Sequence, residues 1–251
     1  MAYKSATIHK SATIYNNMIY GIQKTSFVDC SGVPSRGIQP SLCTVLFFGG
    51  CNLRCPYCHN KDIVLKNTEP LDTDEVFELL ISRKHLIEWV CISGGEPTIY
   101  EDKLVDFVKN LKTAGFKIKL DTNGTKPLVI KDVCEFVDYV ALDVKTINYK
   151  LCNSSDGFFK LIDTLCYLSR IDKPFLLRTT LYPPFVGEYF IRYMLDVFKN
   201  LNIKNIDWFF NAFDNKNVLE EKAKAYASTT SEYIKNLLKD IEIPQDIHIH
   251  F

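Results

Sequence analysis

The sequence predicts an α/β fold in which six parallel strands form an incomplete (β/α)6 barrel. Short apolar runs rich in β-branched and aromatic residues recur along the chain, and most end at Gly, Pro or Asn-Gly turn signals. Segments with apolar residues three or four positions apart lie between several of these runs, as amphipathic helices require. Alternating strands and helices indicate parallel βα units with right-handed crossovers, and six units are too few to close an eight-stranded barrel.

The predicted strands are defined by their composition and by the residues that end them. The first three stop at Gly49-Gly50, Gly94-Gly95 and Asn123-Gly124, and the fifth stops before Pro183-Pro184. The expected strands span residues 44–48, 88–93, 117–121, 139–144, 175–182 and 207–213. Short apolar runs of this kind suit strands that are buried in a parallel sheet.

The predicted helices each carry one apolar face. Asp72 or Thr73 can cap the first helix, and the second ends near Gly115. The apolar faces consist of Val76, Leu79 and Leu80; Leu104, Phe107, Val108 and Leu111; residues within 158–170; Ile191, Met194, Leu195 and Phe198; and Ile234, Leu237 and Leu238. The closing alternation 247–251 predicts an edge strand, with metal binding by His248 and His250 as the alternative.

Composition and charge place the chain among globular proteins. Of its 251 residues, 47% are hydrophobic and 24% are charged, which argues against disorder and against a membrane protein. No apolar run reaches the ~18 residues of a spanning helix. The polar N-terminus does not match a signal peptide, so a cytoplasmic location is expected. Equal totals of 30 basic and 30 acidic residues give no electrostatic signature of nucleic-acid binding.

Three segments are expected along the chain. These are an N-terminal segment, residues 1–20, a core, residues 21–213, and a C-terminal extension, residues 214–251, packed on the core. The core is expected to be one domain, because α/β barrels of this length commonly are. A short duplication, Lys4–Ile8 and Lys10–Ile14, predicts a frayed or edge segment at the N-terminus.

Three cysteines follow the first predicted strand in a C-x3-C-x2-C spacing, namely Cys51, Cys55 and Cys58. A [4Fe-4S] cluster ordinarily takes four Cys thiolates, and a structural zinc ion also takes four protein ligands. A compact loop with three thiolates therefore leaves one metal position free. An open metal position is typical of a catalytic site rather than a structural one.

Two other interpretations of the cysteines are considered. One is a zinc site with His59 as fourth ligand, although Cys58 and His59 are adjacent and adjacent residues seldom both reach one tetrahedral ion. The other is a disulfide framework, but nine is an odd number of cysteines and no secretory signal is present. The cysteines outside the loop lack ligand spacing, and most are expected to be buried: Cys30, Cys43, Cys91, Cys134, Cys152 and Cys166.

Polar motifs follow the later strands. In Ser93–Pro97 two glycines permit close backbone approach to a ligand and Glu96 supplies a carboxylate, with a tight turn as the alternative. Asp121–Gly124 and Asp143–Lys145 end the next two strands, with an Asn-Gly turn and a surface ion pair as alternatives. Arg178 lies within an apolar strand and needs a partner, a role that Asp143 can fill. Sites in parallel α/β folds form at these strand ends.

The cysteine loop, with Tyr57 before Cys58, resembles the C-x3-C-x-aromatic-C hallmark of the radical S-adenosylmethionine (SAM) enzymes, and Gly94–Pro97 resembles their GGEP motif. The resemblance implies a radical SAM partial TIM barrel, a [4Fe-4S] cluster on the three thiolates, and SAM on the open iron. It also implies that one electron cleaves SAM to methionine and a 5′-deoxyadenosyl radical, which abstracts hydrogen from the substrate. No side chain is expected to act as an acid or base, because the protein supplies positioning and electrostatics.

Residues 21–29, 57–60, 94–98 and 121–125 are similar to the activating proteins of glycyl radical enzymes, especially the anaerobic ribonucleoside-triphosphate reductase type, with the pyruvate formate-lyase activating enzyme as a relative. The similarity implies an anaerobic reaction on a glycine in the C-terminal loop of a partner enzyme. The low reduction potentials of such clusters make flavodoxin or ferredoxin the expected electron donor. The implied SAM site comprises Tyr57, His59, Gly94, Gly95, Glu96, Asp121, Asn123, Asp143, Lys145 and Arg178.

Within this site, Glu96 is expected at the amino group of SAM, and Lys145 at its carboxylate. The acidic residues Asp121 and Asp143 are expected near the ribose and carboxylate, where they can also hold a monovalent cation. Asn211, near the end of the sixth strand, is not included in the predicted site.

Two features depart from the activating proteins. The segment Cys30–Gly37 is longer than a compact turn, and the tail from Asp214 onward is an addition. Two alternative functions are therefore retained. One is a radical SAM enzyme for a small molecule, such as the 7-carboxy-7-deazaguanine synthase group, which has Asp-Thr where this chain has His59-Asn60. The other is a non-enzymatic iron–sulfur or zinc module, which predicts no SAM cleavage.

Overall fold

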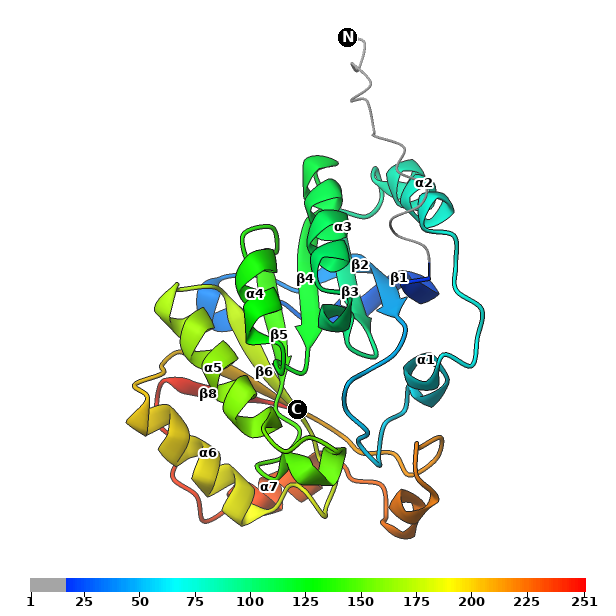
Figure 1. Cartoon of the computed structure of the whole chain (residues 1–251). Coiled ribbons are helices and arrows are strands. Elements are labelled where there is room, and N and C mark those ends of the chain that lie inside the picture. Colours follow the sequence, from blue (N-terminus) through cyan, green and yellow to red (C-terminus); the bar gives the residue numbers. More distant parts are fainter. Residues whose placement is uncertain (1–16) are drawn as a thin grey trace.

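The structure, a computed structural model, describes residues 17–251 and contains one eight-stranded sheet that curves into an open barrel (Figure 1). The strands are β1 Ile19–Cys30, β2 Ser41–Phe48, β3 Trp89–Gly94, β4 Lys117–Thr122, β5 Tyr139–Asp143, β6 Phe175–Thr180, β7 Ile206–Asn211 and β8 Ile247–His250. They lie side by side in chain order, with β2 to β8 parallel and β1 antiparallel to β2. Within residues 17–251, β1 and β8 are the unpaired edges, so the barrel is open between them.

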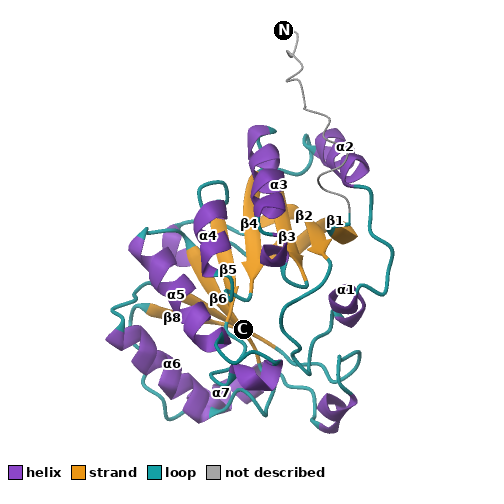
Figure 2. Cartoon of the chain, in the orientation of Figure 1, coloured by secondary structure: helices purple, strands orange, loops and turns teal. Residues whose placement is uncertain are grey.

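Helices cover the outer face of this sheet (Figure 2). The helices of the described residues are α1 Lys61–Leu65, α2 Thr73–Arg83, α3 Asp102–Thr113, α4 Pro127–Val133, α5 Gly157–Arg170, α6 Glu188–Asn200 and α7 Ser231–Leu238, of which α1 lies to one side of the sheet. Residues 17–251 also contain four 3₁₀ turns: η1 Pro34–Arg36, η2 Pro97–Tyr100, η3 Tyr149–Cys152 and η4 Glu221–Ala225. None of the helices among residues 17–251 has the length and apolar content that crossing a membrane requires.

The predicted incomplete barrel is confirmed, with β2 to β7 as its six strands. The Asp72 carboxylate caps α2 by accepting hydrogen bonds from the backbone N–H groups of Asp74 and Glu75, as expected. The prediction missed β1, whose exposure does not alternate and whose pairing with β2 contains register shifts. It also missed α1 and α4, of five and seven residues, because helices this short show too little periodicity.

Alternate strand residues build two separate apolar layers. On β2, Val45 faces the barrel interior and Leu46 faces the helices, and on β3 Cys91 and Ile92 divide in the same way. This period of two follows from the pleat of the strand. Along the interior face of β3, β5 and β6, the apolar residues Cys91, Ala141 and Leu176 come before the polar residues Ser93, Asp143 and Arg178, so this layer supports a polar site at the strand ends.

The long connection between β1 and β2 closes the lower end of the barrel. Val33 in this connection is fully buried and belongs to the interior layer. The buried carboxylate of Asp207 accepts a hydrogen bond from the Ser35 backbone N–H at 2.9 Å and lies 2.8 Å from His250 Nε2. One carboxylate thus joins this connection to β8. The segment Cys30–Gly37, which is longer than a compact turn, therefore closes part of the end of the barrel at which the parallel strands begin.

The C-terminal elements extend the sheet. The predicted final strand is confirmed as β8, which pairs with β7, and the predicted helix is α7, where Ile234 is fully buried. His250 contacts Asp207 and stacks on Phe209 at a ring separation of 4.3 Å. The N-terminal duplication, Lys4–Ile8 and Lys10–Ile14, lies outside the described residues.

Replacement of Leu177 by alanine tests the packing between sheet and helices. Leu177 on β6 is fully buried in the helix-facing layer. Removal of its side chain should lower the free energy of unfolding by about 2–5 kcal/mol in urea titrations. Leu128→Ala is the control, because Leu128 is 69% exposed, and its effect should stay within about 0.5 kcal/mol. Equal losses in both variants would contradict the assigned burial.

Candidate active site

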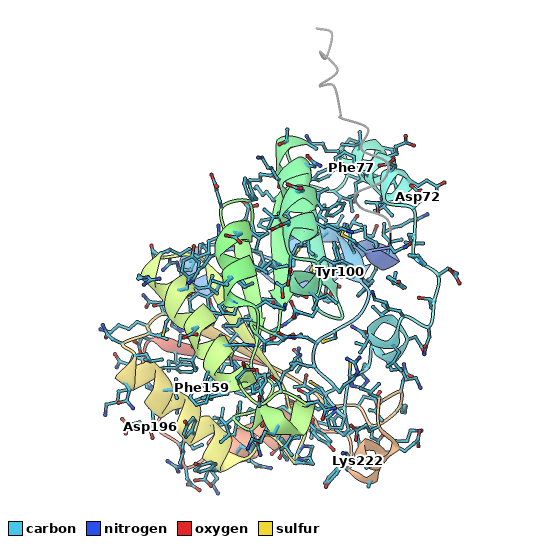
Figure 3. The ribbon with its side chains drawn as sticks, viewed as in Figure 1. Asp72, Phe77, Tyr100, Phe159, Asp196 and Lys222 are labelled. Carbon is cyan, nitrogen blue, oxygen red and sulfur yellow. The ribbon has the colours of Figure 1, made fainter. Side chains whose placement is uncertain are left out.

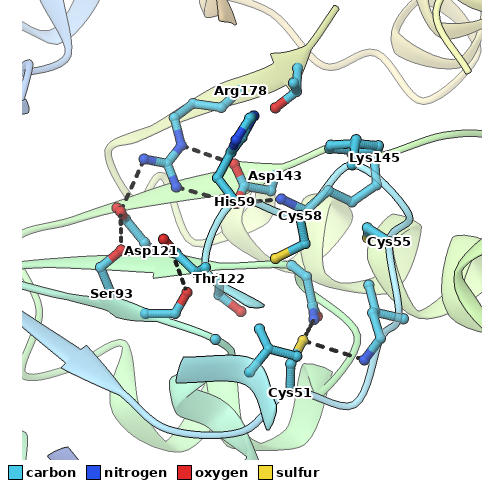
Figure 4. Close-up of a pocket in the computed structure, with 18 of the residues that line it drawn as sticks. Cys51, Cys55, Cys58, His59, Ser93, Asp121, Thr122, Asp143, Lys145 and Arg178 are labelled. Carbon is cyan, nitrogen blue, oxygen red and sulfur yellow. Dashed lines mark hydrogen bonds and ion pairs between the residues drawn. The ribbon is translucent and has the colours of Figure 1, made fainter. Parts of the chain in front are cut away.

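A cavity of about 330 Å³ opens at the carboxyl ends of the barrel strands (Figure 4). All the residues predicted for the site line this cavity except Glu96. Ser93, Thr122 and Asn211, which the prediction did not include, line it as well. Asp29 at the end of β1 and Leu219 in the C-terminal extension also contribute. The volume falls within the range of small-molecule and cofactor pockets.

The cysteine loop between β2 and α1 has little regular structure, and neighbouring segments supply its hydrogen bonds. The Glu96 N–H donates to the Gly50 carbonyl at 2.9 Å, and the Arg54 N–H donates to the Cys152 carbonyl at 3.0 Å. On the opposite flank, the Glu220 N–H donates to the Pro56 carbonyl at 3.0 Å. Three different parts of the chain therefore hold the loop, including the extension after β7.

The three thiols of the loop line the cavity as free cysteines. Burial raises the pKa of the Cys51 thiol to about 12 and also raises that of Cys58. The pKa of Cys55 is raised by a contact with the Cys152 thiol and by burial. A metal must therefore displace their protons when it binds.

These side chains do not form a mononuclear metal site. Among residues 17–251, no three His, Cys, Asp or Glu side chains are placed to hold one metal ion. The zinc interpretation with His59 requires such a group. His59 is exposed, its ring lies 6.3 Å from that of Phe213, and its carbonyl accepts a hydrogen bond from Asn217.

The Glu96 carboxylate lies behind the cavity wall. The prediction had placed it beside the ligand. It is fully buried and accepts hydrogen bonds from the Thr98 N–H, the Thr122 hydroxyl and the Asn123 N–H, the last at 2.6 Å. Burial raises the pKa of this carboxyl, although the same hydrogen bonds oppose the shift. Glu96 therefore joins the turn after β3 to the turn after β4.

Two glycines of the turn after β3 allow it to contact the cysteine loop. A Cβ atom added to Gly95 would lie 1.8 Å from the Gly50 carbonyl oxygen, and one added to Gly94 would lie 2.3 Å from the Phe48 nitrogen. Gly94 also has a φ of 117°, which side-chain-bearing residues rarely adopt. Ser93, Gly94 and Gly95 form this part of the cavity wall.

The turn after β4 is tied to the cysteine loop by side-chain amides. Asn123 Nδ2 donates to Asn52 Oδ1 at 3.0 Å, and Asn52 Nδ2 donates to the Thr125 hydroxyl at 2.7 Å. The Asn123 side-chain oxygen also accepts from the Thr125 hydroxyl at 2.6 Å. Neither Asn52 nor Thr125 was predicted as a site residue, because a single amide or hydroxyl in a loop carries no distinctive spacing.

A network of ion pairs crosses one wall of the cavity (Figure 4). Arg178 Nε and Nη1 contact Asp143 and Asp121, each at 2.9 Å, and Lys145 contacts Asp143 at 2.9 Å. Lys119, 1% exposed, contacts the other Asp121 oxygen at 2.8 Å. The expected pair of Arg178 with Asp143 is present, and Arg178 additionally binds Asp121. The prediction did not include Lys119, which lies beneath the cavity.

The cations set the charge states of this network. Although burial opposes ionisation, Arg178 and then Lys145 lower the pKa of Asp143 to about 2. Arg178 and Lys119 lower the pKa of Asp121 against the same opposing effect. Both carboxylates are therefore charged at neutral pH. Of the three Nζ donors of Lys145, Asp143 takes one, which leaves donors for an anionic ligand.

The sequence comparisons identify the family. The Radical SAM superfamily profile matches residues 45–197, more than half of the chain. A Methanocaldococcus jannaschii protein named as a glycyl-radical enzyme activating enzyme is 40% identical over 106 residues, which cover 40% of this chain and 42% of that protein. The Clostridium pasteurianum pyruvate formate-lyase-activating enzyme is 27% identical over 222 residues, or 80% of this chain and 93% of that enzyme. The chain belongs to the radical SAM superfamily.

Solved structures share the fold. Streptococcus suis SuiB bound to its precursor peptide SuiA superposes with a TM-score of 0.54 at 16% identity, over 80% of this chain and 47% of SuiB. TYW1 with a lysine–pyruvate adduct has a TM-score of 0.51 at 16% identity, over 81% of this chain and 77% of TYW1. These similarities support the partial TIM barrel.

Membership of the superfamily implies a [4Fe-4S] cluster and SAM, and the cavity fits both groups. Three thiols supply the donor set that leaves one iron open. Lys145 has unused donors for a carboxylate. Tyr57 lines the cavity, and its buried hydroxyl has no hydrogen-bond partner among the described residues.

Gly95→Ala should destabilise the site strongly. The new methyl group would meet the Gly50 carbonyl, and neither backbone can move without breaking the bonds that hold the cysteine loop. We expect a loss of about 2 kcal/mol or more in the free energy of unfolding. Gly187→Ala is the matched control, because no atom lies within 4 Å of its added Cβ. A Gly95→Ala protein with the wild-type urea midpoint would contradict the close contact.

Acid titration should reveal the charged network. The folded pKa of Asp143, about 2, lies below its ordinary 3.8, so its stabilising contribution is complete above pH ~4 and is lost toward pH 2. The difference corresponds to roughly 2 kcal/mol. Asp143→Asn should lose stability at neutral pH and show a shallower decline between pH 4 and pH 2 in urea titrations. Parallel pH profiles for the two proteins would refute the assignment.

Proposed function

We propose that the protein cleaves SAM reductively and thereby generates a radical on a glycine of a partner glycyl radical enzyme. The observation that carries this proposal is that three thiols and several charged side chains line one cavity of about 330 Å³ at the strand ends. The names of the similar proteins support an activating role. We propose anaerobic ribonucleoside-triphosphate reductase as the partner.

The chain's own groups would bind and orient the cofactors. Cys51, Cys55 and Cys58 would hold the cluster. Lys145 would bind the carboxylate of SAM, and the backbone around Gly94 and Gly95 would accept hydrogen bonds from its amino group. The Glu96 carboxylate would position that backbone instead of contacting SAM, since its neighbours already occupy it.

Asp121, Asn123, Asp143 and Arg178 would line the ribose and carboxylate side of the ligand, and Tyr57 and His59 would complete the wall next to the cluster. When bound, the two groups supply a 5′-deoxyadenosyl radical that takes the α-hydrogen of the glycine. The protein contributes orientation and exclusion of water, because no acid or base is required.

The open side of the barrel suits a peptide substrate. Within the described residues, β1 and β8 do not pair, and Asp29 of β1 and Asn211 of β7 line the cavity on this side of the sheet. We propose that the glycine loop of the partner enters there. We further propose a cytoplasmic protein that takes its electron from flavodoxin or ferredoxin and has no nucleic-acid partner.

Anaerobic reconstitution tests this function. After loading with iron and sulfide, reduction and addition of SAM, the wild type should form 5′-deoxyadenosine and Cys55→Ala should form at most traces, because it lacks one cluster ligand. Cys166→Ala, a cysteine remote from the cavity lining, should retain the activity. Product quantified by chromatography gives the measurement. Equal activity in wild type and Cys55→Ala would exclude the radical SAM mechanism.

The same samples identify the partner by electron paramagnetic resonance. Addition of the anaerobic reductase should generate a glycyl radical signal. A signal with pyruvate formate-lyase alone would change the partner and keep the activase. Cys55-dependent cleavage with no radical in either protein would support an enzyme that acts on a small molecule.

A further inference from the structure

The proposed function requires an electron from outside the chain. The cysteine loop is covered on one flank by the extension after β7, through the bonds of Pro56 to Glu220 and of His59 to Asn217. On its other flank lies the single turn η3, whose Cys152 carbonyl accepts from the Arg54 N–H. Electron transfer weakens steeply with distance, so an electron donor must dock where the protein layer over the thiols is thin.

The turn η3 connects the thiols to the surface. Its inner residue Cys152 is fully buried and contacts the Cys55 thiol, while the preceding Leu151 is 48% exposed. Cys152, the buried neighbour of the proposed cluster ligand Cys55, is therefore next in the chain to the solvent-exposed Leu151. The Tyr149 side chain packs on the inner side, where its hydroxyl accepts from the Lys145 N–H.

Exposed apolar side chains lie at the starts of the two helices that follow this turn. Phe159, at the start of α5, is 73% exposed (Figure 3), and Tyr189, at the start of α6, is 70% exposed. Ring contacts join η3 to these helices: Tyr149 and Phe158 lie 6.4 Å apart, and Phe158 and Tyr193 lie 5.9 Å apart. Exposed apolar groups that cluster in this way mark interaction surfaces, and aromatic residues dominate their binding energy.

The charge next to the turn is positive. Lys160 is neutralised by Asp156, and Arg192 by Glu188. In contrast, Lys150 on η3 has no carboxylate partner among residues 17–251, and the same holds for Arg54 in the cysteine loop. A carrier with an acidic face around an apolar centre complements such a surface.

We propose that Lys150, Leu151 and Phe159, named the η3 patch, form the docking surface for a small acidic flavoprotein that reduces the cluster. This inference rests on the proposed function. In the transfer, one electron leaves the donor's anionic flavin hydroquinone, which is oxidised to the neutral semiquinone, and the cluster is reduced from the 2+ to the 1+ state. No proton is exchanged. The electron crosses η3 at Cys152 and Cys55.

The test measures binding and electron delivery separately. Cluster-loaded protein is titrated with purified bacterial flavodoxin by calorimetry, and cluster reduction by flavodoxin hydroquinone is followed by electron paramagnetic resonance. Lys150→Glu and Phe159→Asp should each weaken binding by about tenfold, a change of 1.4 kcal/mol, and should slow cluster reduction. Leu86→Asp is the control, because Leu86 is 59% exposed and precedes β3 at the opposite end of the barrel.

Chemical reduction with dithionite separates this inference from the proposed function. Dithionite needs no docking surface, so the variants and the wild type should form equal 5′-deoxyadenosine. If dithionite supports no cleavage in any protein, the proposed function fails while the calorimetry still decides whether the η3 patch binds the carrier.

Three results would overturn the docking surface. One is wild-type flavodoxin affinity in both Lys150→Glu and Phe159→Asp. Another is an equal loss in Leu86→Asp, which would indicate a general surface effect. The third is normal flavodoxin binding with lost binding of the glycyl radical enzyme, which would assign the η3 patch to that partner. Far-ultraviolet circular dichroism confirms that each variant is folded.

Discussion

The cavity wall depends on the hydrogen bonds that the buried Glu96 carboxylate accepts. This carboxylate receives hydrogen bonds from the turn after β3 and from the turn after β4, and the backbone N–H of the same residue donates to Gly50 at the start of the cysteine loop. A buried carboxylate is costly unless its lone pairs are satisfied, so the surrounding donors are as necessary as the carboxylate. One residue thereby fixes three cavity-lining segments relative to each other.

The strand alternation explains why these segments meet in one place. Ser93, Asp121 and Asp143 each lie two positions beyond an interior residue, Cys91, Lys119 and Ala141 respectively. Because the pleat repeats every two residues and the strands are parallel, the last interior position of each strand reaches the same end of the barrel. The apolar layer and the polar site are consequences of one pattern.

Most of the fold and many of the cavity-lining residues could be predicted, because repeated apolar runs and dense motifs at strand ends are visible in the sequence. The remainder depends on distant contacts. For Glu96, expected at the amino group of SAM, the motif could not show that Thr122 and Asn123 donate hydrogen bonds to its oxygens. Leu219 and the role of Asn52 were missed for the same reason. Only the folded chain brings Leu219 to the cavity and places Asn123 beside Asn52 in the cysteine loop.

Lys119 shows how the site is prepared before any ligand arrives. Its ammonium is 1% exposed, contacts Asp121 and also bonds to the Asp29 backbone carbonyl. Desolvation of such a cation is unfavourable, and only the paired carboxylate and further hydrogen bonds compensate for it. With Lys119 below and Arg178 beside it, Asp121 is held from two directions, so its orientation is set by the protein. A ligand that binds there therefore meets polar groups already in place, which reduces the ordering cost of binding.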